Sequence, residues 1–256
     1  MFKRGRRAQA TIFIIIGIII VAAAVIIYLF WPRISQPFQG VSENPESFIE
    51  DCLNTELKKN VDLISKQGGL INPVNYVLNN NDKVEYLCYT SEYYLTCYMQ
   101  RPLLKQNIED EIKKSIKNKV DSCFSEMKAE LEKKGNSVGV NKKDFSVELF
   151  PGRIRVAIDS NVVVSSNRET KTYNRINADL RSNLYDLTAI ASSITNWEAR
   201  YGDAETTVYM AYYPSIKVEK VKLNDGSKVY IITDRNTDEV FKFASRSVVF
   251  PAGYGG

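Results

Sequence analysis

A run of 21 residues without a charged side chain, from Thr11 to Trp31, constrains the fold of this chain more than any other feature. As a helix that rises about 1.5 Å per residue, the run is about 31 Å long, which matches a bilayer hydrocarbon core of about 30 Å. Most of its residues are Ile, Val, Leu, Ala or Phe, which favour insertion. Tyr28 and Trp31 lie where an interfacial aromatic belt is expected. We therefore predict a transmembrane helix over residues 11–31.

Four cations lie in front of this run, and only Arg33 lies close behind it. Because positive charge flanks the cytoplasmic end of a membrane helix, we predict that residues 1–10 form a basic cytoplasmic leader. Residues 32–256 then lie outside the cytoplasm, and the lipid bilayer is the first predicted partner. The residues that set this topology are Lys3, Arg4, Arg6 and Arg7.

Two other interpretations of the apolar run fit its sequence less well. A secretory signal could be cut after the small residues Ala22-Ala23-Ala24, but cleavage normally follows the apolar region and here would fall inside it. A helix buried in a soluble core usually keeps a polar face, whereas this run is apolar on every side. A permanent anchor is therefore the favoured interpretation.

The excess of positive charge belongs to the leader and not to the remainder of the chain. The sequence holds 34 Lys and Arg against 30 Asp and Glu, and its formal net charge is +4. Four of the cations and none of the acids fall within residues 1–31, so the remainder is balanced. A nucleic-acid-binding domain should carry a basic face on its folded part, and we therefore expect no nucleic-acid partner.

Apolar residues at helical spacing predict three further helices, over residues 45–67, 102–134 and about 174–201. Asn44 is a candidate N-cap for the first, and Gly68-Gly69 is a candidate stop signal. The turn sequence Asn224-Asp225-Gly226-Ser227 predicts a hairpin. Strand-like segments are expected at residues 84–99, 145–150, 153–158, 162–165, 216–223, 228–233, 240–243 and 248–250.

These patterns divide the chain behind the membrane helix into four segments. We expect a spacer over residues 32–46, a helical segment with a cysteine hairpin over 47–140, an α+β domain over 141–250 and a flexible tail over 251–256. The expected fold class is α+β, with an N-terminal transmembrane helix followed by an exported domain of long helices and antiparallel sheet.

All of the cysteines fall in the part that is predicted to lie outside the cytoplasm. An even number of cysteines in an oxidising compartment indicates disulfides, and two bridges among four cysteines allow three pairings. Two cysteines fall on the apolar stripes of the first and second predicted helices, which favours a bridge between these helices. A bend at Glu92-Tyr93 would place the other two opposite each other in a hairpin, within disulfide range. Buried free thiols and a zinc site of four thiolates are the alternatives. The favoured pairs are Cys52 with Cys123 and Cys88 with Cys97.

No motif for catalysis or cofactor binding is evident in the sequence. The chain has no histidine, which removes the mechanisms that need an imidazole as base or metal ligand. Ser125 and Lys128 form a serine-lysine pair, but they fall on a solvated helix face. The series Asp234, Asn236 and Asp238 begins like a calcium loop and then lacks the required glycine and glutamate. We therefore expect no enzyme activity, no cofactor and no metal.

Tyrosines gather on the predicted cysteine hairpin. Tyrosine provides rigid, amphipathic contact area, so these side chains form a candidate contact surface. The alternative is that they only fill and cover strands, in which tyrosine is a favoured residue. The candidate contact residues are Tyr89, Tyr93, Tyr94 and Tyr98.

The opening K-R-G-R-R-A-Q-A-T-I-F-I-I-I-G resembles the start of a group of archaeal proteins with a basic leader, one membrane helix and an exported domain. The later segments F-I-E-D-C and K-Q-G-G strengthen this resemblance, which covers about the first 70 residues. The same opening is similar to archaeal pilin leaders, and this similarity implies processing between Ala8 and Gln9. Two features depart from pilins: Phe13 stands where many carry a glutamate, and prolines follow the apolar run closely.

The sequence as a whole predicts a single-pass membrane-anchored protein with a structural or binding role at the cell surface. Other surface proteins or further copies of the same chain are the expected partners. The alternative is a pilin-type subunit of a surface filament that is processed before Gln9.

Overall fold

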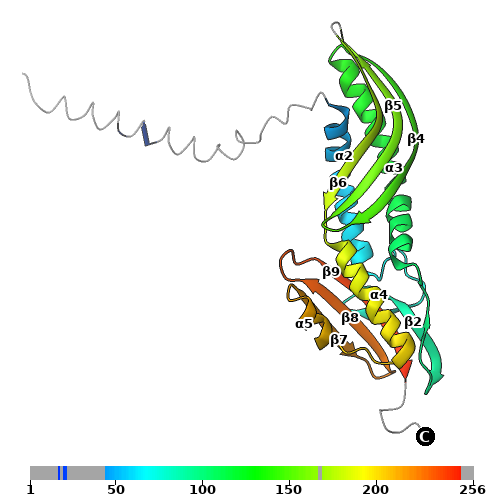
Figure 1. The fold of residues 1–256 in the computed structure, drawn as a ribbon. Coiled ribbons are helices and arrows are strands. Elements are labelled where there is room, and N and C mark those ends of the chain that lie inside the picture. Colours follow the sequence, from blue (N-terminus) through cyan, green and yellow to red (C-terminus); the bar gives the residue numbers. More distant parts are fainter. Residues whose placement is uncertain (1–16, 18–19, 22–43, 167–168, 249–256) are drawn as a thin grey trace, which may run out of the picture. The chain divides into compact units, whose positions relative to one another are not determined.

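A computed structural model describes residues 17, 20, 21, 44–166 and 169–248 of the chain (Figure 1). The predicted leader, the processing site at Ala8 and Gln9, most of the membrane helix and the tail lie outside these residues. Gly17, Ile20 and Val21 are helical. Among the described residues, no helix is both long and apolar enough to cross a membrane. The residues from Asn44 onward fall in one compact unit.

Helix α2 (Pro45–Lys66) begins and ends at the predicted signals. The Asn44 side chain accepts a hydrogen bond from Glu46 N at 3.1 Å, and Pro45 occupies the first helical position. At the other end, Gly68 and Gly69 have positive φ angles, and Gly69 N donates to Ile64 O at 2.9 Å. Both ends are therefore fixed by local chemistry that the sequence displays.

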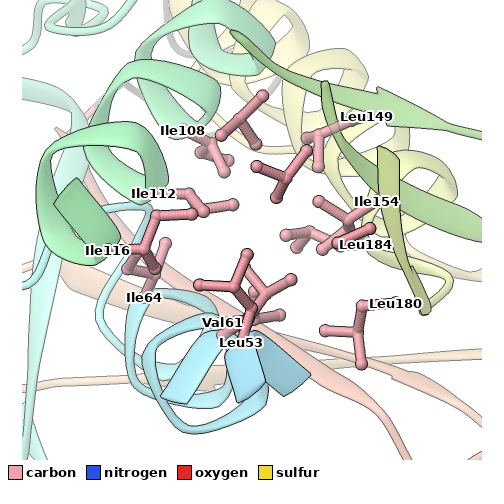
Figure 2. Packing of buried hydrophobic residues seen from close by; sticks show 14 of the residues in the cluster. Leu53, Val61, Ile64, Ile108, Ile112, Ile116, Leu149, Ile154, Leu180 and Leu184 are labelled. Carbon is pink, nitrogen blue, oxygen red and sulfur yellow. The ribbon is translucent and has the colours of Figure 1, made fainter. Parts of the chain in front are cut away.

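Helix α3 (Leu104–Lys133) is 30 residues long and lies against α2. It begins two residues after Pro102, the predicted start. The Cys52–Cys123 disulfide joins the two helices, with a Cα–Cα distance of 5.9 Å. Figure 2 shows how the facing stripes of α2 and α3 contribute Leu53, Val61 and Ile64 from one side and Ile108 and Ile112 from the other to a common core.

A three-stranded antiparallel sheet packs on these two helices (Figure 1). It consists of β4 (Ser137–Phe150), β5 (Arg153–Ser165) and β6 (Thr170–Arg181), in the order β4-β5-β6. The prediction of helix from residue 174 was wrong, because residues 174–181 belong to β6 and α4 (Leu184–Tyr201) begins after them. The burial of β6 alternates, with Ile176, Ala178 and Leu180 inside, as expected for a strand that covers one face of the helices.

The second sheet is mixed and contains the remaining strands. Its order is β1-β2-β9-β8-β7, and β3 pairs with the same edge of β2 as β1. The pairing of β2 with β9 is parallel, whereas all the other pairs are antiparallel. The expected α+β class is therefore confirmed, but this sheet is not purely antiparallel. The strand bounds are β1 Tyr76–Asn79, β2 Asp82–Tyr93, β3 Tyr98–Met99, β7 Ile216–Lys222, β8 Ser227–Asp234 and β9 Val240–Val248.

Helix α4 covers one face of the mixed sheet, over β8 and β9, and the short helix α5 (Thr207–Tyr212) lies beside β7 (Figure 1). One hydrophobic core runs from α2, α3 and the three-stranded sheet to the inner face of α4 and the mixed sheet. The expected domain boundary between residues 140 and 141 falls inside β4. The described chain from Asn44 therefore shares a single main core.

The cysteine hairpin differs from its predicted form. Strand β2 continues to Tyr93, so the expected bend at Glu92-Tyr93 was wrong. Cys88 is paired with Met99, and Cys97 lies in the loop before β3. The Cys88–Cys97 disulfide still forms, with a Cα–Cα distance of 5.3 Å. It closes the loop that connects β2 to β3.

The β7–β8 turn requires a glycine at position 226. Gly226 has a φ of +84°, and a Cβ at this position would lie 2.6 Å from Val248 Cγ2. Gly226→Ala is expected to lower the free energy of unfolding by about 2–3 kcal/mol. The alanine would be strained by the left-handed backbone conformation, and its Cβ would overlap with Val248. The matched control is Gly152→Ala, where φ is +74° and no atom lies within 4 Å. Urea unfolding should show a smaller loss for the control, and equal losses would contradict the overlap with Val248.

Candidate contact surface

The end of the cysteine hairpin carries exposed aromatic side chains. Tyr93, Tyr94 and Tyr98 are 63%, 60% and 67% exposed, and Leu95 between them is 42% exposed. Tyr89 differs from the other three candidates, since it is half-buried with its ring edge against Tyr86 at a centroid distance of 5.0 Å. The structure thus brings three of the four predicted contact residues together. We call Tyr93, Tyr94, Leu95 and Tyr98 the hairpin surface.

Several contacts hold the hairpin surface in place. The Cys88–Cys97 disulfide closes its loop, and Tyr94, which has a φ of +67°, donates its backbone N–H to Val248 O at 2.5 Å. The guanidinium of Arg246 lies 5.4 Å from the centre of the Tyr93 ring, a geometry that favours cation–π attraction. Arg246 also donates to Thr90 O at 2.5 Å and to Asp225 O at 3.0 Å. The aromatic groups are therefore presented on a constrained loop.

A second aromatic group lies on α4 and α5. The rings of Trp197 and Tyr201 are 4.6 Å apart on the outer side of α4, with exposures of 47% and 59%. Tyr212 and Tyr213, at the end of α5, are 78% and 53% exposed. Tyr209 points inward instead, and its hydroxyl lies 2.9 Å from Ser193 Oγ.

Behind the hairpin, a buried polar cluster joins α4 to β8 and β9. Glu198 has no exposed surface, and its Oε1 accepts hydrogen bonds from Ala204 N at 2.9 Å, Lys228 Nζ at 3.0 Å and the Tyr230 hydroxyl. Its Oε2 accepts from Lys228 Nζ at 2.7 Å and from Ser245 Oγ at 2.8 Å. Both carboxylate oxygens are thus engaged, as a buried charge requires.

Lys228 binds two further acceptors in the same cluster. Its Nζ donates to Gly202 O and lies 3.2 Å from Asp203 Oδ1. Asp203 also accepts a hydrogen bond from Lys220 at 2.9 Å. We call Glu198, Asp203, Lys228, Tyr230 and Ser245 the polar cluster.

The polar cluster shifts the pKa of two of its members. Burial, followed by the negative charge and the hydrogen bond of Glu198, raises the pKa of the Tyr230 hydroxyl far above its ordinary value. For Asp203, burial is the largest single influence and acts to raise the pKa. The hydrogen bonds and charges of Lys220 and Lys228 together outweigh it and hold the pKa of the Asp203 carboxyl below its usual range. Tyr230 therefore stays a hydrogen-bond donor and Asp203 stays an anion at neutral pH.

The polar cluster also supports the cysteine hairpin directly. Cys97 N donates to Ser247 Oγ at 3.1 Å, and Ser247 Oγ in turn donates to Glu198 O at 3.4 Å. The Sγ atom of Cys97 lies 3.7 Å from Ser245 Oγ. The loop that carries the hairpin surface therefore rests on the C-terminal turn of α4.

The partial calcium-loop series and the serine-lysine pair have structural roles. Asp234 Oδ1 accepts from Asn236 N at 2.8 Å, and its Oδ2 accepts from Asn183 Nδ2 at 2.6 Å, so this carboxylate organises the β8–β9 turn. Ser125 donates to the backbone of its own helix, and Lys128 pairs with Glu132 on the helix surface. Among the described residues, no group of three or more His, Cys, Asp or Glu is placed to hold a metal ion.

No protein-family model, curated protein or solved structure matches this chain. The polar cluster was not found from the sequence, although Glu198 offers one signal. It lies four residues after Ile194 and eight after Ile190, on the buried side of α4. A carboxylate at an apolar position of an amphipathic helix indicates a buried partner.

Proposed function

We propose that this chain is a membrane-anchored, extracytoplasmic binding module that uses the hairpin surface to contact a partner at the cell surface. The observation that carries the proposal is the gathering of three exposed tyrosines and a leucine at the end of a hairpin that the Cys88–Cys97 disulfide ties together. Exposed large apolar groups that cluster mark interaction sites more often than scattered ones do. The two disulfides support an oxidising compartment for this part of the chain.

The position of the hairpin within the compact unit suits display to a partner. Figure 1 shows the N-terminal end of α2, where the chain enters the unit, in the half with the three-stranded sheet, and the end of β2 near the opposite end. If an anchor precedes α2, the hairpin surface lies far from the residue at which the anchor joins the unit, and it stays accessible to a partner.

The chemistry of the hairpin surface also suits binding. Tyrosine has few rotatable bonds and combines an apolar ring with a hydroxyl, so it contributes contact area at low entropic cost. Aromatic residues are enriched among those that dominate binding free energies. The disulfide, together with the bonds of Tyr94 and Arg246, fixes the loop before binding and reduces the ordering cost further.

Photo-crosslinking in intact cells tests the proposal, because it captures whichever molecule contacts the chosen position. The full chain carries benzoylphenylalanine in place of Tyr98 in one variant and in place of Lys171 in the control. Lys171 lies on β6 with a side chain that is 60% exposed, remote in sequence from the hairpin. We expect a discrete higher-mass adduct from position 98 and none from position 171. The additional substitutions Tyr93→Ser and Tyr94→Ser should reduce the adduct by about tenfold, which corresponds to about 1.4 kcal/mol.

The mass of the adduct separates the two expected kinds of partner. An adduct of twice the chain mass indicates self-association, as a filament subunit requires, and another mass indicates a different surface protein. Equal adducts from positions 98 and 171, or none from either, would overturn the proposed contact surface. The N-terminal residue of the mature protein distinguishes anchor from processed subunit, with Met1 expected for the anchor and Gln9 for the subunit.

A further inference from the structure

Within the polar cluster, the amine of Lys228 lies against the buried carboxyl group of Glu198. Lys228 Nζ lies 2.7 and 3.0 Å from the two oxygens of Glu198, so it is close to the Cδ atom that joins them. The Glu198 side chain is 0% exposed and that of Lys228 is 7% exposed. A nucleophile held against an electrophile in this way has a high effective concentration.

We propose that Lys228 Nζ and Glu198 Cδ form an intramolecular amide bond, which joins α4 to β8 covalently. The reaction needs no oxidant, cofactor or external catalyst, since it only condenses an amine with a carboxylic acid and releases water. The product would connect helix and sheet at the place where the cysteine hairpin rests.

The groups around Glu198 are arranged as the reaction requires. One proton passes from the Lys228 ammonium to Glu198 Oε2, which are 2.7 Å apart, and this transfer gives a neutral amine and a neutral acid. The Nζ lone pair then attacks Cδ to form the C–N bond. Negative charge develops on Oε1, which already accepts hydrogen bonds from Ala204 N and the Tyr230 hydroxyl. These two donors correspond to an oxyanion hole.

The remaining steps release one water molecule and form the amide. Asp203 Oδ1, 3.2 Å from Nζ, accepts a second proton from the attacking nitrogen. The carbonyl re-forms at Oε1, and Oε2 leaves as water with the proton that Asp203 returns. Ser245 Oγ, 2.8 Å from Oε2, holds the leaving oxygen during this step. The third proton of the original ammonium stays on the amide nitrogen.

Mass spectrometry of the full chain, extracted from its native membranes, tests the amide bond directly. The intact mass should be lower by one water than the mass calculated for the mature chain with two disulfides. After reduction, alkylation and trypsin digestion, residues 182–200 and 223–235 should appear as one branched peptide with no cleavage at Lys228. An intact mass without this loss, or separate peptides cleaved at Lys228, would overturn the proposal. A branch to residues 201–217 would also overturn it, because the electrophile would then be Asp203.

Two variants test the assigned roles. Lys228→Arg removes the amine, so the intact mass of this variant should equal its calculated mass without the loss of a water. Tyr230→Phe keeps the ring and removes one oxyanion donor, so cross-link formation in newly synthesised protein should slow by about 100-fold. A Tyr230→Phe chain that folds and cross-links at the wild-type rate would contradict the assigned geometry. Because the wild-type mass is decisive by itself, the test does not depend on the folding of either variant.

Discussion

Replacement of Glu198 by leucine is expected to lower the free energy of unfolding by about 3–5 kcal/mol, the cost of leaving a buried charge without its partner. Leucine has a similar size but accepts no hydrogen bond. The Lys228 ammonium would keep only Gly202 O and the partly exposed Asp203 as acceptors. The hydroxyls of Tyr230 and Ser245 would lose the acceptor that they now share. The loss is expected whether Glu198 and Lys228 are joined by an ion pair or by an amide.

Urea unfolding at neutral pH, followed by circular dichroism, measures this effect. The control is Glu205→Gln, since Glu205 lies seven residues further along and only caps Thr207 at the surface. The control should change stability little, because glutamine retains an oxygen that can accept the same bonds. A Glu198→Leu variant as stable as the control would contradict the structural role given to the polar cluster.

Substitution of both Cys52 and Cys123 by alanine should lower the free energy of unfolding by about 4 kcal/mol in the chain-entropy model. The disulfide spans 71 residues, and removing it frees a long loop in the unfolded chain. The same substitution of Cys88 and Cys97, which are nine residues apart, should cost about 3 kcal/mol. Thermal and urea unfolding of the oxidised proteins check both values.

The two disulfide variants should also differ in their effect on photo-crosslinking. Loss of Cys88–Cys97 should weaken photo-crosslinking from position 98, because that bridge fixes the hairpin surface, whereas loss of Cys52–Cys123 should leave it unchanged. Unaltered stability after removal of Cys52 and Cys123 would show that the helix pair does not depend on the bridge.

The elements that could be predicted from the sequence are those with local signals at their ends. Helix α2 has an N-cap, a proline at its start and two glycines at its end, and the turn at Gly226 follows the preference of a hairpin. The pairing of Cys52 with Cys123 followed from the positions of both residues on helical stripes.

The errors arose where long-range contacts decide the structure. Leu180, Leu184 and Leu187 have helical spacing, so the pattern of α4 was extended backward over β6. Strand β6 is set instead by pairing with β5 over its whole length. The parallel pairing of β2 with β9 joins residues that are more than 150 positions apart, for example Tyr89 and Arg246. No local sequence pattern indicates such a partner.

The candidate site was likewise predicted in part. The tyrosine cluster was found by composition, but the half-buried position of Tyr89 depends on its contact with Tyr86 and on the neighbouring strands. The polar cluster could not be assembled, because its members lie on α4, in the following loop and on two strands. Only the fold brings Glu198 and Lys228, 30 residues apart in the sequence, into contact.

We propose that the disulfide-bonded unit lies outside the cytoplasm while the basic leader lies inside. Intact cells treated with a membrane-impermeant amine-reactive label test it most directly, with peptide mapping of the modified lysines. Lys171 and Lys222, whose side chains are 60% and 69% exposed, should be labelled in intact cells. Lys3 should be labelled only after lysis. Labelling of Lys171 and Lys222 only after lysis would contradict this placement of the unit.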